Sequence, residues 1–216
     1  MRYQTVVFDL DGTLLDTLDD LADSVNAALR ACGYPERSRE EVRRFVGNGV
    51  RLLIERAVPA GTAEAAAERC FALFKEAYGE RMCCKTRPYA GILPLLEALR
   101  ANGVKCAVVS NKYDGAVKRL SETHFGGLMG VAIGERAGVH RKPAPDSVFE
   151  ALKALGVDAG TALYAGDSDV DVQTAHNAGL PCAGVTWGFR DRSVLEEAGA
   201  DFIADTPEQL LKIVMG

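Results

Sequence analysis

The sequence lacks long apolar runs and lacks an excess of basic residues, and each absence excludes a class of protein. The longest apolar stretches, such as the one from Val104 to Val109, are interrupted by Lys105 and are much shorter than the roughly 20 residues of a membrane-spanning helix. The 216 residues include 25 Lys and Arg against 30 Asp and Glu, a net charge of −5, so we expect no nucleic-acid surface. The 48% of hydrophobic residues suffices for the core of one or two domains.

The N-terminus also lacks the features of a secretory signal. Arg2 and Gln4 precede a short apolar run that ends in carboxylates, with no cleavage site of small residues. No two cysteines form a C-x-x-C pair, and the three histidines lack the spacing of zinc ligands. We therefore expect a cytoplasmic protein with reduced cysteines, most of them packing residues among apolar neighbours: Cys32, Cys70, Cys83, Cys84, Cys106 and Cys182.

The first part of the chain predicts one strand followed by a block of helices. Thr5 to Leu10 is a short apolar run typical of a buried strand, and it ends in a loop rich in carboxylates. From about residue 17 to residue 84, apolar residues recur at helical spacing, with breaks at Gly47-Asn48-Gly49 and Pro59-Ala60-Gly61. No strand is predicted within this block.

After Pro88 the pattern changes to alternating helices and strands. This alternation is typical of a parallel sheet with right-handed crossovers. We predict an α/β fold with a doubly wound parallel sheet, formed by residues 1–16 and 86–216, and an inserted all-helical domain of residues 17–85. The later strands are expected at 105–109, 129–133, 162–165, 182–185 and 202–204, and the later helices at 92–101, 114–123, 145–155, 170–178, 193–198 and from 207.

Polar residues follow three of the predicted strands. Asp9 and Asp11 end the first, Ser110 and Asn111 follow the strand at 105–109, and the segment from Asp167 to Asp171 follows the strand at 162–165. Ligands of doubly wound sheets bind beyond the carboxyl ends of the strands, so these side chains are expected to line one crevice. Lys142 precedes the helix that leads into the third of these strands and is expected at the same rim.

This set of residue types favours phosphate chemistry. Clustered carboxylates repel one another unless a cation neutralises them, and Mg²⁺ is usually held by a few carboxylates together with substrate phosphate. An Asp in such a site can attack phosphorus as a nucleophile, while a second Asp two residues later protonates the leaving oxygen. Asp9 and Asp11 have this spacing. Gly12 would let backbone N–H groups approach the phosphate, and Ser110 and Lys142 would stabilise its charged oxygens.

These segments resemble the four ordered motifs of the haloacid dehalogenase-like hydrolases. The matching segments are Phe8-Asp9-Leu10-Asp11-Gly12-Thr13-Leu14, Ser110-Asn111, Lys142-Pro143 and Gly166-Asp167-Ser168-Asp169-Val170-Asp171, which span nearly the whole chain. The resemblance implies a Rossmann-like core, with Asp9 as nucleophile and Asp11 as general acid and base. It further implies a Mg²⁺ ligand set and a phosphate site: Asp9, the Asp11 carbonyl and Asp167 as ligands, Asp171 in support of the metal, and Ser110, Asn111, Gly12 and Lys142 at the phosphoryl group.

The inserted helices resemble the small cap of one branch of this family, which closes over the site and contacts the leaving group. The stretch from Asp9 to Leu21, together with Val46-Gly47-Asn48-Gly49, is similar to bacterial phosphoglycolate phosphatases, although Leu18 stands where those enzymes often have proline. We therefore expect 2-phosphoglycolate as substrate, with Asn48 and Arg51 as substrate contacts. Asp169 is expected to stabilise a helix start rather than to bind the metal.

The motifs leave several alternatives open. Phosphatases of pyrophosphate, nucleotides or sugar phosphates, and a phosphosugar mutase, share Asp9 and Asp11 and differ in the cap. A phosphate-binding module without turnover is the alternative from another class, and the presence of Asp9, Asp11, Lys142 and Asp167 together argues against it. The expected partner is a small phosphate ester, with no nucleic acid and no membrane, and the sequence leaves monomer and homodimer open.

Overall fold

The computed structural model describes residues 1–216, which form two compact units. The first unit, called the core unit below, consists of Met1–Leu15 and Pro88–Gly216, and the second, the helical unit, consists of Asp16–Arg87. No helix in either unit has both the length and the apolar character needed to cross a membrane.

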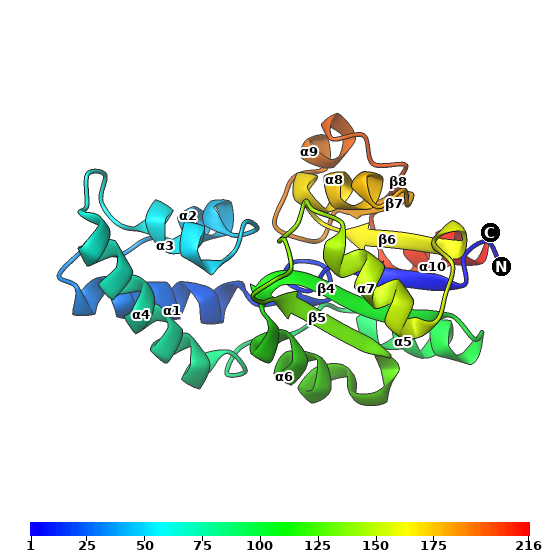
Figure 1. Ribbon diagram of the computed structural model, residues 1–216, viewed down its shortest axis with the longest axis horizontal. Coiled ribbons are helices and arrows are strands. Elements are labelled where there is room, and N and C mark those ends of the chain that lie inside the picture. The colour runs from blue at the N-terminus through cyan, green and yellow to red at the C-terminus, as the bar shows by residue number, and fades with distance from the viewer. The chain divides into compact units, whose positions relative to one another are not determined.

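A six-stranded parallel sheet forms the centre of the core unit (Figure 1). The strand order is β5-β4-β1-β6-β7-β8, so the chain first builds the sheet on one side of β1 and then returns to build it on the other. The predicted α/β fold with a doubly wound parallel sheet is confirmed. The strands are β1 (Thr5–Phe8), β4 (Lys105–Tyr113), β5 (Val131–Glu135), β6 (Ala162–Gly166), β7 (Cys182–Val185) and β8 (Phe202–Ala204).

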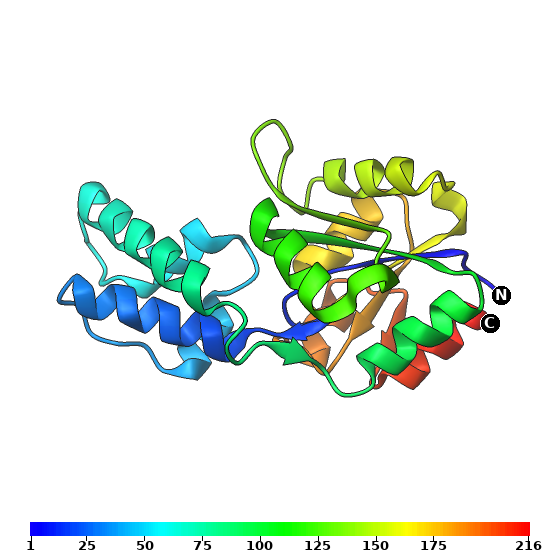
Figure 2. The ribbon, with the colours of Figure 1, turned by 90° about the horizontal axis from the view of Figure 1, so that it is seen from below.

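Helices cover both faces of this sheet. On one face lie α7 (Asp146–Leu155), α8 (Asp169–Asn177) and α9 (Arg192–Glu197), whose buried residues pack against Val7, Val109 and Tyr164 of the strands. The other face carries α5 (Ile92–Ala101), α6 (Asp114–Phe125) and α10 (Pro207–Met215), and Figure 2 shows α5 side by side with α10. Two single 3₁₀ turns, η1 (Gly126–Leu128) and η2 (Ala159–Thr161), complete the connections. Because both faces are covered, every residue of the central strands β1 and β6 is buried.

The helical unit contains four helices and no strand between them. They are α1 (Leu18–Ala31), α2 (Arg39–Phe45), α3 (Val50–Ala57) and α4 (Glu64–Arg81). The chain enters and leaves this unit through two short strands that pair with each other, β2 (Leu15–Asp16) and β3 (Arg87–Pro88).

The longest pair of helices, α1 and α4, forms the core of the helical unit. Leu21, Val25 and Leu29 recur every four residues on α1 and are buried, as helical periodicity requires of a helix packed on one side. On α4 the rings of Phe74 and Tyr78 stack with centroids 5.5 Å apart. The unit therefore has an apolar core of its own.

Most predicted boundaries lie within two residues of the observed ones, and β4 is the exception. The strand was predicted to end at Val109, but it continues through Ser110, Asn111 and Lys112 to Tyr113. These polar residues are buried, so the change from apolar to polar residues does not mark the end of the strand.

Candidate active site

The site lies where the strand order reverses. Asp9 directly follows β1, and Asp167 directly follows the neighbouring strand β6. On the other side of β1, the end of β4 supplies Ser110. The carboxyl ends of these three parallel strands meet at the topological switch point, which is the usual ligand site of such sheets.

Three carboxylates and one ammonium group form the centre of the site. Asp9, Asp167 and Asp171 are buried, and one oxygen from each lies within 4.8 Å of the others. The Lys142 Nζ donates to Asp9 Oδ1 at 2.6 Å and to Asp171 Oδ1 at 2.8 Å. One ammonium against three carboxylates leaves two negative charges in excess.

The pKa shifts of these groups reflect first their burial and then the charges of their neighbours. Burial raises the pKa of Asp9 well above its ordinary value, the Lys142 ammonium opposes the shift, and the Asp171 and Asp167 carboxylates add to it. Burial and then Asp171 raise the pKa of Asp167 to about 7, against the hydrogen bonds that it accepts. For Lys142, burial acts to lower the pKa, but the Asp171 and Asp9 carboxylates outweigh it and the net shift is upward.

Asp167 is held in place by hydrogen bonds and by two glycines. Its Oδ1 accepts from the Thr13 hydroxyl at 3.1 Å, and its Oδ2 accepts from the Phe189 N–H at 2.7 Å. A Cβ on Gly12 would lie 2.3 Å from Asp167 Oδ2, and one on Gly188 would lie 2.3 Å from Asp167 Cβ. Both glycines are therefore needed for the carboxylate to occupy this position. The Gly12 N–H itself donates to the Leu15 carbonyl at 2.9 Å, and its predicted phosphate contact stays a prediction.

Lys142 is fixed through both its main chain and its ammonium group. Its backbone N–H donates to Asn111 Oδ1 at 2.8 Å, and its carbonyl accepts from Asn111 Nδ2 at 3.1 Å. The ammonium also donates to the Tyr164 hydroxyl at 3.1 Å. The Asn111 amide therefore positions the Lys142 backbone, and its predicted contact with phosphate stays a prediction.

Both carboxylate oxygens of Asp171 already accept hydrogen bonds. Oδ1 accepts from Lys142 and, at 3.1 Å, from the Tyr164 hydroxyl. Oδ2 accepts from the Ser168 N–H at 3.1 Å and the Ser168 hydroxyl at 2.6 Å. A Cβ on Gly166 would lie 2.3 Å from Asp171 Cβ, so this carboxylate also needs a glycine beside it. These contacts favour a supporting position for Asp171, beside the carboxylates of Asp9 and Asp167.

Asp11 lies apart from the three carboxylates and has its own cationic partner. Lys112 Nζ lies 3.0 Å from Asp11 Oδ1. The Lys112 side chain is only 2% exposed, whereas that of Asp11 is 13% exposed. The Ser110 hydroxyl accepts from the Lys112 N–H at 3.2 Å, which ties these neighbouring residues together.

Sequence reasoning missed Lys112 and Tyr164. Lys112 directly follows Ser110 and Asn111, and a lysine this close to a phosphate-site motif was a usable signal. Tyr164 lies within the apolar run of β6, where an aromatic residue is most often core, and nothing in the sequence links its hydroxyl to Lys142.

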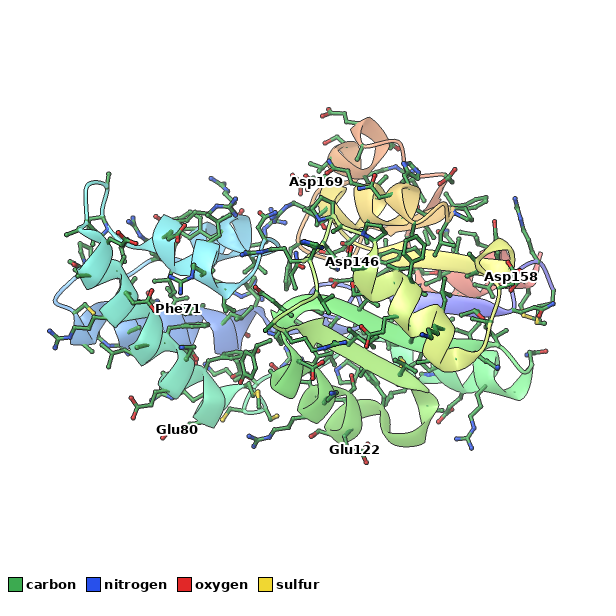
Figure 3. The ribbon with its side chains drawn as sticks, in the orientation of Figure 1. Phe71, Glu80, Glu122, Asp146, Asp158 and Asp169 are labelled. Atoms are coloured by element: carbon green, nitrogen blue, oxygen red, sulfur yellow. The ribbon has the colours of Figure 1, made fainter.

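The predicted cap contacts belong to the helical unit, where each has a local partner. Asn48 Oδ1 accepts from the Arg56 guanidinium at 3.0 Å. Arg51 pairs with Glu68 at 2.5 Å and lies over the ring of Phe71, which is labelled on α4 in Figure 3. Asn48 and Arg51 stay predictions as substrate contacts.

Asp169, also labelled in Figure 3, is the first residue of α8 and is not one of the three clustered carboxylates. An acidic side chain in the first turn of a helix interacts favourably with the helix dipole. Its position is that of a residue stabilising the start of α8, as expected.

The donor set fits a hard divalent cation. Asp9 and Asp167 are buried and supply only oxygen atoms, and together with Asp171 they set three carboxylates against the one Lys142 ammonium, an excess of negative charge. A dication bound to these oxygens would remove that excess, and oxygen ligands are those that Mg²⁺ prefers.

Comparison with known proteins agrees with this geometry. Residues 6–185 match the model of the haloacid dehalogenase-like hydrolase family. The chain is 37% identical over 204 residues to a phosphoglycolate phosphatase of Mesorhizobium japonicum, covering 91% of this chain and 88% of that one. It is 32% identical over 212 residues to a phosphoglycolate phosphatase of Aquifex aeolicus, covering 98% of this chain and 96% of that one.

Solved structures show the same fold. A crystal structure from Lactobacillus delbrueckii subsp. bulgaricus superposes with a TM-score of 0.94 at 36% identity, covering 99% of each chain. The structure of CbbY from Rhodobacter sphaeroides in complex with phosphate superposes with a TM-score of 0.76 at 26% identity, covering 96% of each chain. The motifs, the fold and the family match agree, and the chain belongs to the haloacid dehalogenase-like hydrolases as an enzyme of the phosphatase type.

Proposed function

We propose that the protein is a Mg²⁺-dependent phosphomonoesterase that hydrolyses 2-phosphoglycolate to glycolate and phosphate. The observation that carries the proposal is the buried group of Asp9, Asp167 and Lys142 at the switch point of the sheet. Relatives named phosphoglycolate phosphatase, similar over nearly the whole chain, support the choice of substrate.

The two aspartates after β1, Asp9 and Asp11, have different roles in the reaction. The Asp9 carboxylate attacks phosphorus and forms an aspartyl-phosphate, while the bond from phosphorus to the leaving oxygen breaks. Asp11 gives its proton to that oxygen, which leaves as the alcohol group of glycolate. Asp11 then takes a proton from the water that attacks the aspartyl-phosphate, so phosphate departs and both aspartates return to their starting state.

The remaining residues bind and orient the phosphoryl group. Lys142 would neutralise a phosphoryl oxygen next to Asp9, and the Ser110 hydroxyl, in the last part of the neighbouring strand β4, would bind another. Asp9, Asp167 and the Asp11 carbonyl would hold Mg²⁺, supported by Asp171. The bound cation would neutralise phosphate and carboxylate charge and so bring two anions together. The helical unit would act as the cap that excludes water.

The substrate is tested by phosphate release from 2-phosphoglycolate, pyrophosphate, a nucleoside monophosphate and a hexose phosphate, each with Mg²⁺ and with EDTA. We expect release that depends on Mg²⁺ and a kcat/KM for 2-phosphoglycolate about 100-fold above the other compounds, the discrimination that one buried charged contact can supply. A different leading compound would contradict the proposed substrate. Isomerisation of the hexose phosphate in place of phosphate release would indicate a mutase.

Metal binding is expected to stabilise the protein. At a Mg²⁺ concentration 100-fold above its Kd, the free energy of unfolding rises by about 2.7 kcal/mol, which for a chain of this size raises Tm by about 5–10 °C. Asp167→Asn should lose most of this shift, and Asp169→Asn should keep it. An equal shift in wild type and Asp167→Asn, measured by thermal unfolding, would place the metal elsewhere.

The same shift should depend on pH. Since the pKa of Asp167 is raised to about 7, the metal-free protein at pH 6 carries a proton there that the cation must displace. Mg²⁺ affinity should therefore fall as pH falls from 8 to 6. Titration of the Tm shift with Mg²⁺ at both pH values checks this direction.

Replacement of Arg51 tests whether the helical unit contacts the substrate. Glu68 already neutralises Arg51 at the surface, so a substrate carboxylate can gain only a modest contact there. We expect Arg51→Ala to lower kcat/KM for 2-phosphoglycolate about fivefold and to leave hydrolysis of an aryl phosphate unchanged. Arg69→Ala, an exposed arginine on α4, is the matched control. Equal losses on both substrates would assign Arg51 to packing between α3 and α4.

A further inference from the structure

Lys112 is a buried cation that the catalytic steps above do not use. It lies at the end of β4 in the core unit, and its side chain is 2% exposed. A buried ammonium group is costly unless an anion accompanies it, and Asp11 Oδ1 lies 3.0 Å from it. Because burial of this ammonium group costs free energy, its position suggests a role in function.

The backbone around Lys112 is shaped to bury it. Between the pairs Val109↔Ile133 and Tyr113↔Glu135 the register of β4 shifts against β5, so three residues of β4 stand opposite one of β5. Such a bulge redirects side chains at the end of a strand, and here Ser110, Asn111 and Lys112 are all buried.

Gly134 is the residue of β5 that lies opposite this bulge. A Cβ there would lie 2.5 Å from the Lys112 carbonyl oxygen. The close approach of the two strands therefore requires glycine at this position. The bulge and the glycine together fix the Lys112 main chain, so the lysine is held in place from both strands.

The position of Lys112 relative to Asp11 defines what it can reach. Asp11 has to lie within hydrogen-bond distance of the leaving oxygen to protonate it. In 2-phosphoglycolate the carboxylate carbon is two bonds from that oxygen, so a carboxylate oxygen lies about 3 Å from it. Lys112 Nζ is 3.0 Å from Asp11 Oδ1 and is therefore within range of such a carboxylate.

Charge also favours Lys112 over Arg51 as the partner of the substrate carboxylate. Glu68 forms an ion pair with Arg51, and the negative charges of Glu55 and Glu64 also interact with it. A substrate anion at Arg51 would meet three carboxylates. At Lys112 it would meet Asp11, whose proton passes to the leaving oxygen during the same step.

We propose that Lys112 is the specificity-determining residue for the leaving group. Its ammonium group binds the carboxylate of a 2-phospho-oxy acid, of which 2-phosphoglycolate is the smallest, while Asp11 protonates the ester oxygen beside it. The inference rests on the proposed phosphatase function and extends it, since it names the residue that recognises the leaving group.

The test compares two substrates that differ only at the carboxylate, 2-phosphoglycolate and 2-hydroxyethyl phosphate. Lys112→Met should lower kcat/KM for 2-phosphoglycolate by about 100-fold, mainly through KM, because a charged contact to the substrate is lost. For 2-hydroxyethyl phosphate the loss should be below about fivefold. Lys118→Met removes the same charge from an exposed Lys–Asp pair, in which Lys118 lies 2.6 Å from Asp114, and should leave both values unchanged.

Product inhibition supplies a second readout. Glycolate should inhibit wild type, and it should inhibit Lys112→Met at least tenfold more weakly, because glycolate carries the carboxylate without the phosphate. Lys112→Gln, which keeps a polar N–H group in place of the ammonium, should lose selectivity in the same way. It serves as the test if Lys112→Met does not fold.

The outcomes separate the two proposals. Equal losses of kcat on both substrates, with glycolate inhibition unchanged, would show that Lys112 only holds Asp11, and the specificity proposal would be overturned. A wild type that hydrolyses 2-hydroxyethyl phosphate and not 2-phosphoglycolate would overturn the proposed substrate itself.

Discussion

Asp9→Asn is expected to lower kcat by about 10⁴-fold or more for every phosphate ester, because the amide has no anionic oxygen to attack phosphorus. The fold should survive. Asparagine has nearly the same shape, and its Oδ1 can still accept from Lys142 Nζ, as Asp9 Oδ1 does at 2.6 Å. Thermal unfolding of the metal-free variant should give a Tm equal to or above that of wild type, since one of three clustered buried carboxylates is removed.

The matched control is Asp169→Asn, which makes the same chemical change two residues after Asp167. Asp169 is half-buried and is not one of the clustered carboxylates, so kcat should stay within about threefold of wild type. Residual turnover by Asp9→Asn near the wild-type rate, with the fold intact, would exclude a covalent intermediate on this residue.

Lys142→Met should have the largest combined effect on activity and stability. The ammonium group forms ion pairs with both Asp9 and Asp171, and the Lys142 side chain is 3% exposed. Removal leaves buried carboxylates without a counter-charge, a change that typically costs about 3–5 kcal/mol. We also expect kcat to fall by about 10³-fold, since a charged group that stabilises the transferring phosphoryl group is lost.

The stability loss should depend on pH with a definite sign. In the variant, the pKa of Asp9 rises further because the opposing ammonium is gone, so the folded state takes up a proton that the unfolded chain releases. Stability of the variant should fall as pH rises from 5.5 to 8, and Mg²⁺ should restore part of it. Urea unfolding at the two pH values measures this difference.

Lys153→Met is the control for Lys142→Met. Lys153 is exposed on α7, and its loss should change the free energy of unfolding by less than about 0.5 kcal/mol at either pH. A Lys142→Met variant as stable as this control at pH 8 would show that the carboxylates find another counter-charge.

The elements of the fold could be predicted because apolar periodicity decides them. The buried apolar residues of α1 recur at the i, i+3, i+4 spacing of a helix, and β1 and β7 are entirely buried, mostly apolar runs. The end of β4 could not be predicted in this way, because its last residues are polar. Polarity usually marks the end of a strand, but here Ser110 to Lys112 are buried because they line the site.

The candidate site could be predicted where it depends on strand ends. Parallel strands end at the same edge, so the convergence of Asp9 and Asp167 follows from topology alone. The support of Lys142 by Asn111 joins residues 31 positions apart, and the bulge that buries Lys112 depends on Gly134 in another strand. Such contacts depend on side-chain orientation across strands, which a one-dimensional pattern does not contain.

The position of β1 in the sheet has a consequence for the order of folding. This strand pairs on one side with β4, where Thr5 meets Lys105, and on the other with β6, where Thr5 meets Ala162. Both partners lie far along the chain, so pairing of β1 requires the closure of long loops, which slows folding. During synthesis the continuous helical unit leaves the ribosome before either partner. We expect it to collapse first and to shorten the effective loop that β1 has to close.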